Sequence, residues 1–430
     1  MMRADILATW SPVMSSHIIP SARSVVAAGT RERRLHDLAI RDVPFGADRL
    51  PAKDLPWWRE MAATGTRAWL DTGDLDEAAG LWCASFAALT TNNTLLNKEV
   101  QKGLYDSLVQ EAAALVRDLP EEEQLVELAF LLNARHGLRL ASRFGGRVSV
   151  ELHTACADDI ERSVAYGRRF FAICPEHFIV KIPLTPSGLL ATRRLRAEGI
   201  PVNFTLGFSA RQNLIAAALS APSYVNVFLG RLNAYVSDNK LGDGVNVGEK
   251  TTLASQRILR QRTAHRLVPT LQIAASMRSG AQVVSLAGVD VHTMPPKAAV
   301  EALAAGGPVR DRTSEDPAVQ VAAGAGLEGL WTIGAAEIAL ADSLENQPPA
   351  TPADLVARCT AHGLGGLFPA FDTTEAAAIA SDGKIPKHAR WASRITAGTA
   401  TVDGLLTAAA LASFTADQAA LDARIKRFIG

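Results

Sequence analysis

The chain has 430 residues, which is long enough for one large domain with additions or for two domains. Its composition, 48% apolar and 20% charged, is ordinary for a soluble globular protein. Because 44 basic and 44 acidic residues cancel, no net charge would draw the chain to nucleic acid or to an anionic membrane surface.

Cysteine spacing and hydropathy are typical of a cytoplasmic protein. Cys83, Cys156, Cys174 and Cys359 show no CxxC spacing, which argues against a zinc site or a disulfide framework and suits reduced thiols. No apolar run approaches the length of a membrane span. The N-terminal stretch is interrupted by Asp5 and makes a poor signal peptide. We therefore expect a cytoplasmic protein.

The N-terminal part is predicted to be an extension that precedes the main domain. Residues 1–55 are rich in Ser, Arg and Pro and show no sustained hydrophobic period, so we expect them to be partly disordered or to cover a partner subunit. A short helix is predicted over residues 54–64, with Asp54 as its N-cap and Pro56 in its first turn. Trp57 and Trp58 are expected to pack this helix onto the main body rather than to bind a ligand.

From residue 66 onward, apolar β-branched runs alternate with helical patterns. Strands are predicted over residues 67–72, 86–91, 147–152, 178–182, 201–206, 224–229, 270–275 and 289–293. Helices are predicted over residues 101–143 with a new start at Pro120, and over 186–197, 210–220, 249–265 and 278–287. Eight such units predict a (β/α)8 barrel over residues 66–305. The alternative is an open doubly wound sheet, but only Gly73 follows the first strand, where a glycine-rich nucleotide loop would be needed.

The C-terminal part, residues 306–430, is longer than a barrel needs. A helix-start pattern at residues 351–358 and an amphipathic pattern at 413–428 predict a helical extension packed on the barrel. The Gly- and Pro-rich segment 363–371 has no assigned structure. The expected organisation is thus an extension (1–65), a catalytic barrel (66–305) and a helical extension (306–430).

The fourth predicted strand contains a single lysine, Lys181, at its carboxyl end. A Pro/Thr/Ser/Gly cluster follows the strand and indicates a turn into a helix. Loss of hydration disfavours an ammonium, so a lysine buried there could supply the free amine that forms a Schiff base with a carbonyl. The alternative is an ordinary strand-end lysine with its head in water.

Further polar residues follow the other strands, where a barrel places its catalytic groups. Each could separately be a cap, a turn residue or a solvated charge, but together they converge on one face. An aspartate can take up a hydroxyl proton during carbon–carbon cleavage, and a carboxylate with a hydroxyl can activate water. Arginine forks suit a phosphate, and amides can hold substrate hydroxyls. The residues are Asp71, Asn92, Glu151, Asn203, Thr205, Arg231, Ser276 and Arg278.

In these motifs the chain resembles the transaldolase family over residues 66–304. The matching stretches are Leu70-Asp-Thr-Gly-Asp74, Thr90-Thr-Asn92, Val148-Ser-Val-Glu151, Val180-Lys-Ile-Pro-Leu-Thr-Pro-Ser-Gly188, Val202-Asn-Phe-Thr-Leu206, Phe228-Leu-Gly-Arg231, Ala274-Ala-Ser-Met-Arg278 and Leu286-Ala-Gly-Val-Asp290.

The resemblance implies a role for each of these positions. Lys181 would form the Schiff base and Asp71 would transfer protons, while Glu151 and Thr205 would activate water. Substrate would bind to Asn92, Asn203, Asn226, Phe228, Arg231, Ser276 and Arg278, with the two arginines at its phosphate. The activity implied is transfer of a dihydroxyacetone unit between sugar phosphates in the pentose phosphate pathway, without cofactor or metal. The family also offers homodimers.

Three positions depart from the family pattern. Asn226 stands where most members have a serine that contacts the ketol end of the donor, so it could replace that hydrogen bond or change the donor. Asn93 replaces a usual proline, which would leave its loop freer to move. His153 stands where an aspartate is usual and is interpreted as a loop histidine rather than a pocket residue. Two other functions therefore stay open: an aldolase of specialised sugar metabolism, and a non-catalytic sugar-phosphate-binding protein.

Overall fold

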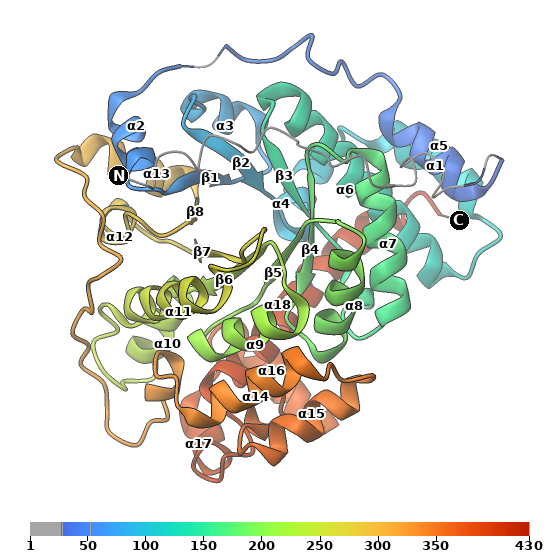
Figure 1. The fold of residues 1–430 in the computed structure, drawn as a ribbon. Coiled ribbons are helices and arrows are strands. Elements are labelled where there is room, and N and C mark those ends of the chain that lie inside the picture. The colour runs from blue at the N-terminus through green and yellow to red at the C-terminus, as the bar shows by residue number, and fades with distance from the viewer. Residues whose placement is uncertain (1–26, 28, 52, 430) are drawn as a thin grey trace.

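Eight parallel strands close into a barrel in the computed structural model, which describes residues 27, 29–51 and 53–429 (Figure 1). Each strand pairs with the next along the chain, and β8 closes the ring on β1. The predicted (β/α)8 barrel is confirmed, and the open-sheet alternative is wrong. The strands are β1 Arg67–Asp71, β2 Phe86–Thr90, β3 Arg147–Glu151, β4 Phe178–Pro183, β5 Val202–Thr205, β6 Tyr224–Phe228, β7 Leu271–Ala275 and β8 Val291–Met294.

Helices between the strands form the outer wall of the barrel. They are α3 Leu75–Leu81, α4 Asn93–Gln101, α5 Asp106–Val116, α6 Glu121–Phe144, α7 Ile160–Ile173, α8 Pro186–Ala197, α9 Ala210–Ser220, α10 Leu229–Asp238, α11 Val247–Thr263, α12 Gly280–Ser285 and α13 Pro296–Ala305. Of these, α8 and α9 begin and end at the predicted residues. Their starts are fixed by Thr185 and Ser209, which cap the first turns with side-chain hydrogen bonds.

The prediction of helix from residue 101 is wrong at its start. Gly103 has a φ of +79°, a left-handed conformation that ends α4. The next helix, α5, begins only at Asp106, and Leu104 is 50% exposed instead of lying on a buried stripe. Pro120 precedes α6, as predicted.

The N-terminal extension has more regular structure than its sequence indicates. Helix α1 (Arg31–Ile40) packs on α5, α6 and α7, with Leu35 and Leu38 buried. Its remaining residues are mostly charged, so the apolar stripe is too narrow to recognise in the sequence. The described part of the extension therefore covers its own barrel. The expectation of disorder in residues 1–26 lies outside the described residues.

The second helix, α2 (Pro56–Ala63), places its two tryptophans as predicted. Trp58 is buried against Phe86, and the Trp57 indole N–H donates to Gly307 O at 3.2 Å. The predicted cap is wrong: Leu55 occupies the N-cap position, and Asp54 pairs with Arg59 instead, at 2.6 Å.

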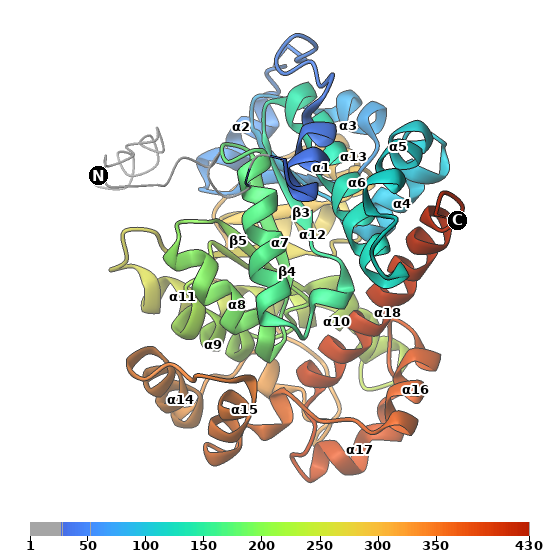
Figure 2. The ribbon, with the colours of Figure 1, turned by 90° about the vertical axis from the view of Figure 1, so that its right-hand side faces the viewer.

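The C-terminal part forms a tier of helices beside the barrel (Figure 2). It comprises α14 Ala335–Asn346, α15 Pro352–Ala361, α16 Thr373–Asp382 and α17 His388–Thr396. The tier packs on the barrel through α14 on α9 and α15 on α8. The last helix, α18 (Val402–Ile425), runs from this tier back to the barrel and packs along α4 and α6.

The two predicted C-terminal helices are found as α15 and α18, although α18 begins well before residue 413. The unassigned segment 363–371 contains one short 3-10 turn, Gly365–Leu367. Within the described ranges, no helix has both the length and the apolar character that crossing a membrane requires.

Candidate active site

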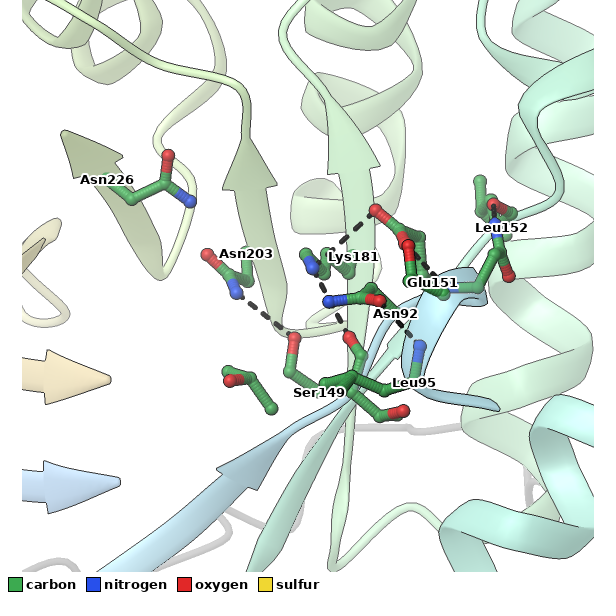
Figure 3. A network of polar contacts seen from close by, with 12 residues as sticks. Asn92, Leu95, Ser149, Glu151, Leu152, Lys181, Asn203 and Asn226 are labelled. Carbon is green, nitrogen blue, oxygen red and sulfur yellow. Dashed lines mark hydrogen bonds and ion pairs between the residues drawn. The ribbon is translucent and has the colours of Figure 1, made fainter. Parts of the chain in front are cut away.

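Lys181 lies on β4, in register with Glu151 on β3 and Asn203 on β5. Only 5% of the residue is exposed, so the interpretation as a lysine with its head in water is wrong. Its Nζ donates to Thr91 O at 3.2 Å and lies 3.6 Å from Glu151 Oε1 (Figure 3). An amine held away from bulk water beside a carboxylate has the surroundings of a nucleophilic lysine.

Glu151 is buried directly beside that amine. Burial raises the pKa of Glu151, and this effect outweighs the nearby charge of Lys181 and the hydrogen bond from Asn93 N, which lower it. The amide of Asn93 donates to Glu151 Oε2 at 3.2 Å. A carboxyl whose pKa is raised in this way is suited to giving and taking a proton.

Asp71 ends β1 on the same side of the barrel. Its Oδ1 accepts a hydrogen bond from Thr90 Oγ1 at 2.7 Å, and Thr90 Oγ1 lies 2.6 Å from Thr293 Oγ1. Because Thr90 has one hydroxyl proton and gives it to Asp71, Thr293 is the donor in the second bond. This chain of hydroxyls fixes the orientation of the carboxylate.

Two polar atoms on β5 are buried without a partner within the described part of the chain. Asn203 donates through Nδ2 to Ser149 Oγ at 3.0 Å, but its Oδ1 and the hydroxyl of Thr205 have no hydrogen-bond partner there. Buried polar atoms are seldom left unpaired, so both are candidates for contact with a ligand or water. Nearby, Asn92 Oδ1 caps α4 by accepting from Leu95 N.

Arg231, in the first turn of α10, is the cationic end of the site. It is 7% exposed, and its Nη1 has no hydrogen-bond partner among the described residues. Burial and the charge of Arg278 lower the pKa of Arg231 to about 10, against the opposing charge of Asp417. A buried arginine with a free N–H group suits an anionic ligand.

Nine of the eleven predicted site residues line one cavity of about 200 Å³. Glu151 lies behind Lys181 rather than in the lining. Arg278 is exposed and lines the neighbouring groove, so the structure does not bring it to the cavity beside Arg231. The nine lining residues are Asp71, Asn92, Lys181, Asn203, Thr205, Asn226, Phe228, Arg231 and Ser276.

Several lining residues come from segments that the sequence did not connect with the site. Phe414 and Asp417 come from α18, and Lys384 follows α16. The Phe414 ring centre lies 5.7 Å from Lys181 Nζ and 5.7 Å from the guanidinium carbon of Arg231. The amphipathic pattern at 413–428 predicted the helix, but which residues it turns to the barrel depends on packing far along the chain.

At the three positions that depart from the family pattern, each side chain makes polar contacts that fix it. Asn226 uses both polar atoms of its amide in bonds to the backbone of the β5 turn. Asn93 is buried, and its side chain accepts from Asn133 Nδ2 at 3.3 Å, so its loop is held rather than free. His153 Nε2 lies 3.3 Å from Asp422, outside the cavity lining, which agrees with a loop histidine.

No group of three or more His, Cys, Asp or Glu within the described ranges is arranged to hold a metal ion. The fold and the cavity define an α/β-barrel protein with a candidate site built around a buried lysine. Lysine, two carboxylates, free hydroxyl and amide groups and an arginine make up this site.

Comparison with known proteins identifies the family of this chain. A family model described as transaldolase/fructose-6-phosphate aldolase matches residues 68–347, which include all eight strands except Arg67, the first residue of β1, and the chain belongs to this family. A probable transaldolase of Thermus thermophilus is 38% identical over 232 residues, covering 53% of this chain and 86% of that protein. A transaldolase of Xanthomonas euvesicatoria pv. vesicatoria is 31% identical over 236 residues, covering 53% and 71%.

Proposed function

We propose that this family member is a transaldolase-type transferase that moves a dihydroxyacetone unit from a ketose phosphate to an aldose phosphate. The observation that carries the proposal is the buried Lys181 amine, 3.6 Å from Glu151 and in the same cavity as Asp71. Donors would be sedoheptulose 7-phosphate and fructose 6-phosphate, as in the pentose phosphate pathway. A cytoplasmic location, a homodimer and independence of cofactors stay predictions.

The reaction would begin with attack of Lys181 Nζ on the ketose carbonyl, and loss of water would give an imine. Asp71 would then take the proton of the C4 hydroxyl while the bond between C3 and C4 breaks, releasing an aldose phosphate. The three-carbon enamine would stay on Lys181, add to the carbonyl carbon of the incoming aldehyde, and Asp71 would return its proton to the new hydroxyl.

Water leaves during imine formation and returns during its hydrolysis. Glu151, 3.6 Å from the Lys181 amine, would exchange protons there, and the unpaired Thr205 hydroxyl in the cavity would hold that water. Asn92 and Asn203 would bind the hydroxyls of the three-carbon unit. These roles account for two unpaired buried atoms of the cavity, Asn203 Oδ1 and the Thr205 hydroxyl oxygen.

The phosphate would lie at Arg231, the buried cation of the cavity. Ser276 adds a hydroxyl to the same lining, and Lys384 adds a second positive charge. Arg278 supports the positive potential from the adjacent groove, since its charge acts on Arg231. Phe414 covers the lysine and would keep bulk water from the imine.

A transfer assay tests the proposal. With fructose 6-phosphate as donor and erythrose 4-phosphate as acceptor, the protein should form sedoheptulose 7-phosphate. Turnover of another ketose without sedoheptulose 7-phosphate would favour the specialised aldolase. Ligand binding with no turnover and no imine would favour the non-catalytic binding protein.

A further inference from the structure

The turn that follows β5 is held by one side chain on both sides of Thr205. Asn226, on the neighbouring strand β6, donates through Nδ2 to Phe204 O at 2.5 Å. Its Oδ1 accepts from Gly207 N at 3.2 Å. The amide of Asn226 therefore bridges the residue before Thr205 and the second residue after it.

The bridged turn has a backbone conformation that needs such support. Leu206 has a φ of +68°, which is unusual for a residue other than glycine. Its carbonyl accepts from Thr407 Oγ1 of α18 at 3.0 Å, and the Thr205 carbonyl accepts from Leu184 N at 2.9 Å. Conformations of this kind persist where the surroundings fix them, and they are concentrated at functional sites.

All three carbonyls from residue 204 to residue 206 are thus bound, while the side chain of Thr205 is not. Its hydroxyl is fully buried, lines the cavity and has no hydrogen-bond partner in the described part of the protein. Because no side chain or backbone group in the described part holds this hydroxyl by a hydrogen bond, its position depends on the backbone conformation of Thr205. The turn therefore directs an unpaired hydroxyl into the cavity.

We propose that Asn226 is a positioning residue: it fixes the β5 turn so that the Thr205 hydroxyl points to the water and imine at Lys181. The proposal rests on the function proposed above. It differs from a role in binding substrate directly, because each polar atom of the Asn226 amide makes a hydrogen bond to the backbone of the β5 turn, and we assign its effect to those bonds.

The test is a double-mutant cycle between Asn226→Leu and Thr205→Val, two substitutions that remove polar atoms and keep the number and branching of the side-chain heavy atoms. Asn226→Leu should lower kcat on the order of tenfold to a hundredfold, as expected for a displaced catalytic group, with little change in KM for the ketose phosphate. In the Thr205→Val background the same substitution should cost almost nothing further, because the group it positions is gone.

Asn239→Leu is the matched control. The Asn239 amide also bridges backbone groups, donating to Pro386 O at 3.0 Å and accepting from His388 N at 2.8 Å, but it does not line the cavity. It should lower the melting temperature and keep kcat. Should Asn226→Leu not fold, Thr407→Val removes the other anchor of the turn and is expected to give the same non-additive loss with Thr205→Val.

Two results would overturn the inference while leaving the proposed function intact. One is a rise in KM with unchanged kcat, which would make Asn226 a substrate ligand. The other is full additivity with Thr205→Val. If the unmodified protein forms no borohydride-trappable imine with fructose 6-phosphate, the proposed function fails, and this inference fails with it.

Discussion

At Asn93 the chain uses a backbone N–H that a proline in the same position would lack. That N–H donates to the Glu151 carboxylate at 3.2 Å and lowers its pKa, opposing the larger effect of burial. Asn93 is also the first residue of α4, a position where proline fits without strain. Substitution by proline therefore removes one hydrogen bond to a proposed catalytic group and keeps the helix.

For Asn93→Pro we expect the pKa of Glu151 to rise further. If the ionised carboxylate is needed, the acidic limb of the kcat–pH profile should move to higher pH, with activity lost first at the acidic end. Asn93→Ala is the control, because it removes the side chain and keeps the N–H. The interpretation fails if both substitutions move the profile equally, or if neither does.

At the residue scale, the candidate site could be predicted from the polar side chains on and directly after the strands. An apolar strand has no packing reason to contain Asp71, Lys181 or Asn203, so the pattern of residue types alone indicates a site. The sequence could not show that Arg278 turns to the neighbouring groove, or that the Asn226 amide is taken up by backbone groups. Both depend on local backbone conformation rather than on strand position.

At the element scale, α18 joins the C-terminal tier to the candidate site. Its first part is buried on nearly all sides, so that stretch has little amphipathic period and the sequence predicted only the second part of the helix. Its Asp403, fully buried, accepts two hydrogen bonds from Arg211 at 2.8 Å and one from Ser209 at 2.6 Å. This ion pair fixes α18 against the start of α9.

Breaking the Asp403–Arg211 pair should lower the free energy of unfolding substantially. Burial alone would raise the pKa of Asp403, but Arg211 and the hydrogen bonds outweigh it and hold the pKa below its ordinary value. Asp403→Asn would leave Arg211 with Glu337, 3.9 Å away, as its one carboxylate partner among the described residues. We expect a loss of about 3–5 kcal/mol in the free energy of unfolding, measured with urea at neutral pH.

Glu198→Gln serves as the matched control, since Glu198 pairs with Arg168 on the surface at 2.6 Å. That change should cost no more than about 1 kcal/mol. The Asp403 contribution should be complete above the carboxyl pKa of the unfolded chain and fall away as the pH drops through the lower folded value. Equal losses for the two substitutions would contradict the proposed role of the Asp403–Arg211 pair.

For the whole molecule, the barrel was predictable because each of its eight strands carries its own local pattern. The contribution of the C-terminal part to the site was not, because it comes from packing: residues after position 305 bring Lys384, Phe414 and Asp417 to a cavity formed mainly by residues before that position. The site is therefore composed of the barrel and its extension together. α18 closes it through Phe414, which faces both Lys181 and Arg231.

The central claim is that Lys181 forms a Schiff base with a ketose phosphate. Incubation with fructose 6-phosphate and borohydride, followed by mass spectrometry of peptides, should place a reduced three- or six-carbon adduct on Lys181. The adduct should vanish in Lys181→Ala and persist in Lys387→Ala, a lysine outside the cavity lining. An adduct that survives in Lys181→Ala, or that maps to another lysine in the unmodified protein, would contradict the claim.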